Sequence, residues 1–337
     1  MGPVDHLQGS SNLIQTILEP LYSLDHLDQQ SPLQRLVHPV LAKAGLQVWI
    51  KRDDLLLLPK DAAFPAFCGN KWRKLKYNLR QARQQGSNLL LTFGGAYSNH
   101  IAAVAAAGSL FGFSTVGVIR GEPHEPMNPT LTFAKKAGMR LIYLSRSAFR
   151  QKEDPQLLSN WRADLGAFFL VPEGGTNALA LRGCRELGQE IVGQLGQAPD
   201  YLCVGAGTGG TAAGLIQCAK LASTQVLIFP ALKGDFMQGT IRSLCGETAA
   251  AAWEIVPDYH FGGYARWNQP LLDTIRSFQA LTGVPLDPIY TGKLIHGFLA
   301  EAEKGRFPDG ACIVLVHTGG LQGIVGFQER FGIDLAN

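Results

Sequence analysis

The sequence predicts an α/β protein with two open, twisted, mostly parallel sheets flanked by helices. Short apolar runs alternate along the 337 residues with helical stretches of about 10–15 residues, the pattern of parallel sheets with helices on both faces. Glycine-rich turns follow several of these runs, where a parallel strand passes into a helix. Too few strands lie on either side of about residue 170 to close a barrel, so two open sheets are favoured.

The hydrophobic pattern assigns a range to each expected element. Strands are predicted at 48–50, 89–93, 115–119, 140–144, 167–171, 201–205, 225–229 and 312–316. Helices are predicted from about residue 72 onward and at 99–111, 129–138, 178–194, 210–222, 269–282, 293–304 and 321–331. Ser31 and Pro32 also resemble the start of a helix, with Ser31 as its N-cap.

Composition excludes several classes of protein. The chain is 46% apolar and 17% charged, as expected of a globular protein with a substantial core. A net charge of +3 without a long basic run gives no support to nucleic-acid binding, and no apolar run is long enough to span a membrane. The six cysteines lack metal-ligand spacing and are expected to be buried, reduced and unrelated to any metal centre. No signal peptide is apparent, so we expect a cytoplasmic protein.

Lys71 is the first candidate for chemistry. It follows Gly69 and Asn70 and precedes an amphipathic helix whose apolar residues fall at 72, 75, 79 and 82. A positive side chain gains nothing from the dipole at a helix N-terminus, which suggests that the amine rather than the cation is used. A lone lysine is more often a solvated surface residue, and on this residue alone that alternative stays open.

A second candidate is the turn at 94–100, which follows the strand at 89–93. Gly94 and Gly95 let the backbone approach a ligand closely, and Ser98 and Asn99 stand at the N-cap region of the next helix. The N–H groups of a helix start are suited to binding a carboxylate. The alternative is that Ser98 or Asn99 only caps the helix.

A third candidate is the turn at 205–211, between the strand at 201–205 and a helix. Residues 205–210 match G-x-G-x-x-G, so a nicotinamide-dependent dehydrogenase must be considered. The nucleotide motif also needs an acidic residue after the next strand, and none occurs between Thr211 and Lys233. The turn therefore favours a single phosphate group, held by backbone N–H groups and threonine hydroxyls.

Further glycine turns lie at 172–177, 290–293 and 317–320. His317 could serve either the structure or the site, and Tyr264 taken alone favours ordinary packing. A reactive lysine, a phosphate-binding turn, a carboxylate-binding turn and no metal constellation together fit pyridoxal 5'-phosphate. A dehydrogenase and a non-catalytic binder of small ligands remain the alternatives from other classes.

From about residue 31 to 331 the chain resembles the fold type II (tryptophan synthase β-like) pyridoxal-phosphate enzymes. Within them it is similar to the family of 1-aminocyclopropane-1-carboxylate deaminase and D-cysteine desulfhydrase. The motifs that carry this resemblance lie at 51–54, 69–75, 94–100, 207–211, 290–293 and 317–320.

The resemblance implies a role for each motif. Lys71 would be the catalytic Schiff-base lysine, with Lys74 near it or near the cofactor phosphate. Ser98, Asn99 and His100 would receive the substrate carboxylate, Asn99 also lying beside the cofactor 3-hydroxyl. Catalysis would further involve Tyr290, against the pyridine ring, and Tyr264, on the substrate side. The remaining cofactor contacts would be Gly207, Thr208, Gly209, Gly210 and Thr211 at the phosphate, and Thr291 and Thr318.

The resemblance also implies how the chain is divided. A larger cofactor-binding domain would comprise residues 1–73 and 172–337, and a smaller domain, residues 74–171, would be inserted between them. The cofactor would lie in the cleft between the domains, and the chain would form a homodimer.

Two positions distinguish the activities of the family. Deaminases typically carry glutamate and leucine where this chain has Thr291 and Thr318, so it resembles the D-cysteine desulfhydrases. A hydroxyl opposite the pyridine nitrogen makes a milder electron sink than a carboxylate does, which suits β-elimination from a small D-amino acid. The alternative is 1-aminocyclopropane-1-carboxylate deamination. Tyr97 and the pair Ile101–Ala102 depart from the family pattern beside the carboxylate turn.

Overall fold

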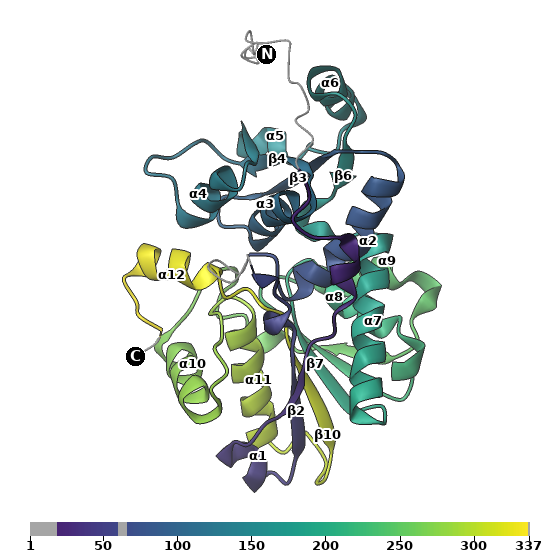
Figure 1. Ribbon diagram of the computed structural model, residues 1–337. Coiled ribbons are helices and arrows are strands. Elements are labelled where there is room, and N and C mark those ends of the chain that lie inside the picture. The colour runs from purple at the N-terminus through teal and green to yellow at the C-terminus, as the bar shows by residue number, and fades with distance from the viewer. Residues whose placement is uncertain (1–18, 60–65, 336–337) are drawn as a thin grey trace.

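The structure is a computed structural model that describes residues 19–59 and 66–335. Its strands form two sheets, one above the other in Figure 1. The order is β1-β2-β10-β7-β8-β9 in the six-stranded sheet and β5-β4-β3-β6 in the four-stranded sheet. Neighbouring strands are parallel except β1 and β2. The predicted fold class is confirmed.

The strands are β1 (Leu33–Arg35), β2 (Gln47–Arg52), β3 (Leu89–Gly95), β4 (Ser114–Arg120), β5 (Arg140–Leu144), β6 (Phe169–Val171), β7 (Tyr201–Ala206), β8 (Gln225–Pro230), β9 (Ala252–Ile255) and β10 (Cys312–His317). The helices are α1 (Pro39–Lys43), α2 (Asn70–Gln84), α3 (Asn99–Phe111), α4 (Pro129–Lys136), α5 (Arg146–Phe149), α6 (Pro155–Leu165), α7 (Ala178–Leu195), α8 (Gly210–Ile216), α9 (Phe236–Cys245), α10 (Gln269–Thr282), α11 (Thr291–Glu303) and α12 (Gly323–Phe331).

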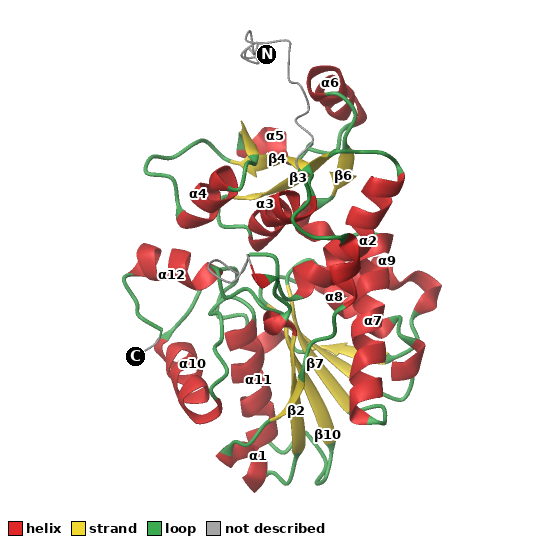
Figure 2. Ribbon diagram, in the orientation of Figure 1, coloured by secondary structure: helices red, strands yellow, loops and turns green. Residues whose placement is uncertain are grey.

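Helices cover both faces of each sheet (Figure 2). On the six-stranded sheet, α1, α10 and α11 pack on one face, and α7, α8 and α9 pack on the other. On the four-stranded sheet, α2, α3 and α4 cover one face, and α5 and α6 cover the other. The central strand β10 serves both cores, because Ile313 and Leu315 point to one face and Val314 and Val316 to the other.

The predicted helix start at Ser31 is wrong. Leu33–Arg35 is a strand paired with β2, and the Ser31 hydroxyl donates to Asp53 Oδ1 at 2.6 Å. Ser-Pro is a local signal, and pairing with a distant strand overrides it. The sequence patterns also did not indicate β9 or α9.

The carboxyl ends of the strands set the place of the site. Strands β3 and β7 run into the turns at 94–100 and 205–211, and both turns line one cavity. The four-stranded sheet is drawn from residues 89–171, inside the segment predicted as the smaller domain. The exact domain boundaries remain a prediction.

None of the helices among the described residues combines the length and apolar character needed to cross a membrane. All six cysteines are buried and none forms a disulfide.

Candidate active site

The start of α2 is fixed by backbone contacts with two strand ends. The Gly69 N–H donates to the carbonyl of Asp53, which follows β2, and the Asn70 N–H donates to the carbonyl of Thr318, which follows β10. A Cβ at Gly69 would lie 2.2 Å from the Thr318 carbonyl oxygen, and the φ of Gly69 is +63°. Only glycine fits this close, left-handed approach. Lys71 is thereby brought to the junction of two strands.

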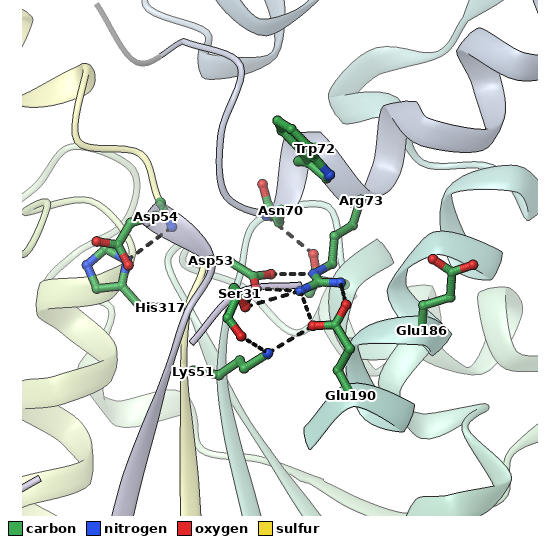
Figure 3. A network of polar contacts seen from close by, with 12 residues as sticks. Ser31, Lys51, Asp53, Asp54, Asn70, Trp72, Arg73, Glu186, Glu190 and His317 are labelled. Atoms are coloured by element: carbon green, nitrogen blue, oxygen red, sulfur yellow. Dashed lines mark hydrogen bonds and ion pairs between the residues drawn. The ribbon is translucent and has the colours of Figure 1, made fainter. Parts of the chain in front are cut away.

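A buried ion cluster holds the first turn of α2 from below (Figure 3). Arg73 pairs with Asp53 at 2.7 Å and with Glu190 of α7 at 2.8 Å, and Lys51 of β2 also pairs with Glu190 at 2.8 Å. Ser31 donates to Asp53. Although burial opposes its charge, pairing with Asp53 and Glu190 raises the pKa of Arg73. The guanidinium therefore stays charged and ties three elements together.

Lys71 is held as a weakly basic amine. Its Nζ donates to Asn70 Oδ1 at 2.9 Å, and Asn70 Nδ2 donates to Thr211 Oγ1 at 3.3 Å. Burial, with the nearby charge of Lys74, lowers the pKa of Lys71 to about 7. An amine with this pKa is substantially unprotonated at neutral pH, which a nucleophilic lysine requires.

Lys74 lies one helical turn further on, beneath the 205–211 turn. Its Nζ donates to the carbonyl of Gly174 at 3.2 Å, to Thr176 Oγ1 at 3.1 Å and to Thr208 Oγ1 at 3.2 Å. These partners are neutral, so the buried ammonium has no counter-charge among them. A Cβ at Gly210 would lie 2.8 Å from Thr176 Oγ1 and 3.0 Å from Lys74 Nζ, so glycine is what lets these two side chains approach the turn so closely. Hydroxyls, backbone N–H groups and an uncompensated cation form a donor set suited to phosphate.

In the 94–100 turn, Ser98 caps α3. Its Oγ accepts hydrogen bonds from the N–H groups of His100 and Ile101, which leaves the hydroxyl proton available to a ligand. Both Ser98 and Asn99 line the cavity. Capping and carboxylate binding are therefore compatible here.

His100 is buried beside the two lysines. Thr92 Oγ1 donates to the carbonyl of Val171 and accepts from His100 Nε2 at 2.8 Å, which places the ring proton on Nε2. The Nδ1 atom makes no hydrogen bond of normal geometry with the described residues. Burial and the charges of Lys71 and Lys74 lower the pKa of His100 well below its usual value. The ring is neutral, so its predicted contact with a carboxylate would not be an ion pair.

Tyr290 and Tyr264 form the aromatic wall. Their rings meet edge to face, with centroids 6.3 Å apart, and a Cβ at Gly207 would lie 3.0 Å from Tyr290 Cε1. Burial, with Tyr264 and Asp287 nearby, raises the pKa of Tyr290 well above its usual value. The phenol therefore stays protonated, and glycine at position 207 lets the turn pack directly against the Tyr290 ring.

Thr291 is buried behind this wall. Its Oγ1 donates to Asp287 Oδ1 at 2.7 Å, and the N–H groups of Ile289, Tyr290 and Thr291 also donate to the Asp287 carboxylate. Asp287 thus fixes the turn that presents Tyr290. The cofactor contact assigned to Thr291 stays a prediction.

Two residues near the site have structural partners. His317 donates from Nε2 to the Pro285 carbonyl at 2.7 Å, and its Nδ1 lies 3.2 Å from Asp54 Oδ1. Lys293 Nζ donates to the carbonyls of His260 and Gly263 at 2.9 and 2.7 Å, which anchors the loop that carries Tyr264. Neither side chain lines the cavity, and both hold its walls.

All these elements surround one cavity of about 870 Å³. Every predicted site residue except Thr291 lines it: Lys71, Lys74, Ser98, Asn99, His100, Gly207, Thr208, Gly209, Gly210, Thr211, Tyr264, Tyr290 and Thr318. The lining also includes charged residues that the sequence analysis did not select: Arg120, Arg146, Arg150, Lys152, Glu173 and Arg330. Arg120 directly follows a predicted strand, which is the one signal that could have found it.

The residues present fit pyridoxal phosphate. Lys74, whose hydrogen-bond partners are neutral, and the glycine-rich turn above it would bind the phosphate, and the weakly basic Lys71 would react with the aldehyde. Among residues 19–59 and 66–335, no group of three or more metal-ligating side chains occurs.

The fold and site define a pyridoxal-phosphate-dependent enzyme of fold type II. The family described as "Pyridoxal-phosphate dependent enzyme" matches residues 25–319, and the chain belongs to it. This sets aside the nicotinamide alternative for the 205–210 turn.

Within that family the chain belongs to the group of 1-aminocyclopropane-1-carboxylate deaminases and D-cysteine desulfhydrases. It is 28% identical to a Pyrococcus furiosus protein provisionally named a 1-aminocyclopropane-1-carboxylate deaminase, over 94% of this chain and 97% of that one. It is 27% identical to D-cysteine desulfhydrase of Salmonella typhimurium, over 91% and 96%. A solved structure, described as an ACC deaminase homologue, superposes with a TM-score of 0.77 at 26% identity, covering 92% of this chain and 95% of the other.

The ion cluster predicts a large loss of stability on Arg73→Met. The substitution leaves Asp53 and Glu190 buried with one cation fewer, so urea unfolding should show a loss of about 3–5 kcal/mol. Arg80→Met is the matched control. Arg80 lies on the same helix as Arg73 but pairs with the exposed Asp28, so its loss should cost less than about 1 kcal/mol. Equal losses for the two variants would contradict the role of the cluster.

The lowered pKa of Lys71 predicts how cofactor attachment depends on pH. A lysine with its ordinary pKa of 10.5 is charged at neutral pH, whereas Lys71 loses its proton near pH 7. The rate of covalent attachment to cofactor-free protein should therefore rise about tenfold per pH unit below pH 7 and level off above it. Stopped-flow absorbance measures this rate, with N-acetyl-lysine as the control. A protein rate that keeps rising to pH 10 would show that Lys71 is an ordinary lysine.

Proposed function

We propose that the chain catalyses α,β-elimination on a small D-amino acid, most simply the conversion of D-cysteine to pyruvate, sulfide and ammonia. The observation that carries the proposal is a weakly basic Lys71 in a cavity where, among the described residues, the one lining carboxylate is already paired. That carboxylate belongs to Glu173, the one acidic lining residue in the part of the chain that the structure describes, and it pairs with Lys152 at 3.2 Å. By the resemblance to the family, positions 291 and 318 separate the two activities of the group, and threonine occupies both in this chain.

Pyridoxal phosphate, when bound, supplies an electron sink for the negative charge that develops at the substrate Cα. Without a carboxylate partner at its nitrogen, the cofactor ring withdraws electrons less strongly. This weaker electron withdrawal is sufficient for β-elimination from a substrate with a good leaving group.

The side chains divide the remaining work. Lys71 holds the cofactor and, once the substrate amine has displaced it, its amine accepts the α-proton. The Ser98 hydroxyl and the Asn99 amide hold the substrate carboxylate, which fixes the direction of the Cα–H bond. Tyr290 packs against the cofactor ring, and Tyr264 faces the substrate from the other side.

Of the two threonines, Thr318 stands closer to the chemistry. It lines the cavity, and its carbonyl already fixes the N-terminus of α2, whereas the Thr291 hydroxyl is engaged by Asp287. We therefore propose Thr318 as the hydroxyl nearer to the cofactor and Thr291 as its support.

The alternative, 1-aminocyclopropane-1-carboxylate deamination, is favoured by the names of some relatives. That substrate has no α-proton, and its ring opening requires the stronger sink. The two activities differ in products, since the deamination releases 2-oxobutyrate and no sulfide.

The role of Lys71 predicts that Lys71→Ala removes the visible absorption band of the purified protein and its activity. Lys233→Ala is the matched control, because Lys233 is an exposed lysine next to the cavity residue Leu232 and should leave the band intact. Absorbance spectra before and after borohydride measure the effect. Retention of a borohydride-sensitive band in Lys71→Ala would reject the assignment.

The threonine pair predicts a preference between substrates. The kcat/KM for D-cysteine should exceed that for 1-aminocyclopropane-1-carboxylate by at least about tenfold, a difference of about 1.4 kcal/mol in transition-state binding. Sulfide, pyruvate and 2-oxobutyrate are assayed in parallel, with L-cysteine as the control for chirality. A higher value for the cyclopropane substrate would overturn the proposal in favour of the alternative.

A further inference from the structure

The substrate end of the cavity carries more positive charge than the proposed reaction of D-cysteine needs. Among residues 19–59 and 66–335, seven cationic side chains line the cavity, against one acid, Glu173. Lys71 and Lys74 serve the cofactor, and Lys152 pairs with Glu173. Four guanidinium groups remain, those of Arg120, Arg146, Arg150 and Arg330. None of the four forms an ion pair with a described residue.

Two of these arginines flank the position proposed for the substrate. Arg120 ends β4 beside the carboxylate turn, and its Nη2 lies 3.5 Å from where a Cβ on Gly95 would stand. Arg330 comes from α12, which packs against α4 of the other layer (Figure 1), and its guanidinium lies 5.9 Å from the Tyr97 ring in the same turn. The two guanidinium groups thus approach one turn from two layers of the molecule.

Arg120 and Arg330 line the same cavity as Tyr264, the tyrosine proposed to face the substrate. Burial, together with Asp287, raises the pKa of its phenol, and the positive charges of Arg120 and Arg330 oppose that rise. Both guanidinium groups therefore act on the same hydroxyl.

We propose that Arg120 and Arg330 form a subsite for a second anionic group, so that the preferred substrate is an amino acid with an oxyanion on its β-carbon substituent. Planar guanidinium groups pair with carboxylate, sulfonate or phosphate oxygens through two parallel hydrogen bonds. The α-carboxylate is already provided for by Ser98 and Asn99, which leaves these arginines to the side chain. The inference rests on the proposed function, which places the α-carboxylate in this turn.

With such a substrate the elimination follows the same steps as with D-cysteine, and only the leaving group differs. The α-proton passes to the Lys71 amine, and a double bond forms between Cα and Cβ. The bond from Cβ to its substituent breaks with its electron pair, and a phosphate or sulfite anion departs. Water then converts the remaining enamine to pyruvate and ammonia. Aspartate mimics such a substrate without reacting, because its β-substituent is a carboxylate held by a carbon–carbon bond.

The test is a binding titration of the cofactor-loaded protein, followed by its visible spectrum. Aspartate and asparagine, each as both enantiomers, differ in charge and little in shape. For the enantiomer that binds better, aspartate should bind at least about tenfold more tightly than asparagine, the gain expected of a charge-assisted contact. Arg120→Gln and Arg330→Gln should each weaken aspartate binding about tenfold and leave asparagine binding within about twofold.

Arg140→Gln is the matched control. Arg140 is an exposed arginine at the start of β5, the strand next to β4, where it is paired with Val116, four residues before Arg120; its replacement should change neither affinity. Equal affinities for the two ligands, an aspartate that leaves the spectrum unchanged, or equal losses for both ligands in Arg120→Gln would overturn the proposal. Failure of the proposed elimination would appear separately, as an absence of pyruvate from every substrate alongside an intact preference for aspartate.

Discussion

Burial of the Arg73 guanidinium between Asp53 and Glu190 is the constraint on which the catalytic geometry depends. Arg73 follows Lys71 by two residues in α2. The ion pairs that hold Arg73 in place therefore also fix the position of the Lys71 backbone. Buried ion pairs contribute little net stability, because desolvation offsets their attraction, but they penalise any other arrangement. The cluster therefore serves as a positioning device, joining β2, α2 and α7 beneath the cavity floor.

Burial also makes the Lys71 amine a weak base. A cation at the N-terminus of α2, near Lys74 and out of water, is disfavoured, and its proton is released near pH 7. Two basic residues in one helical turn thus differ in their partners. Arg73 is paired with carboxylates and stays charged, whereas Lys71 has a neutral amide as its hydrogen-bond partner.

The sequence predicted the parts of the site that local patterns encode. Strand-to-helix turns such as 94–100 and 205–211 carry glycines and capping residues next to each other. Their positions, and the kind of ligand group that each could bind, could therefore be predicted from the local sequence. Long-range features were not. Glu190 lies 117 residues from Arg73, and Arg330 meets the carboxylate turn only through packing of α12 against the other layer. The prediction at Ser31 was wrong because its hydrogen-bond partner, Asp53, follows the strand β2 and lies 22 residues away in the sequence.

Peptide mapping after borohydride reduction tests the central claim, that the position of α2 makes Lys71 the cofactor-bearing amine. Reduction fixes the cofactor to its lysine, and mass spectrometry of the digested protein then locates the added pyridoxyl group. The account predicts one modified site, Lys71. A modification at Lys74, Lys233 or Lys293 instead would contradict it.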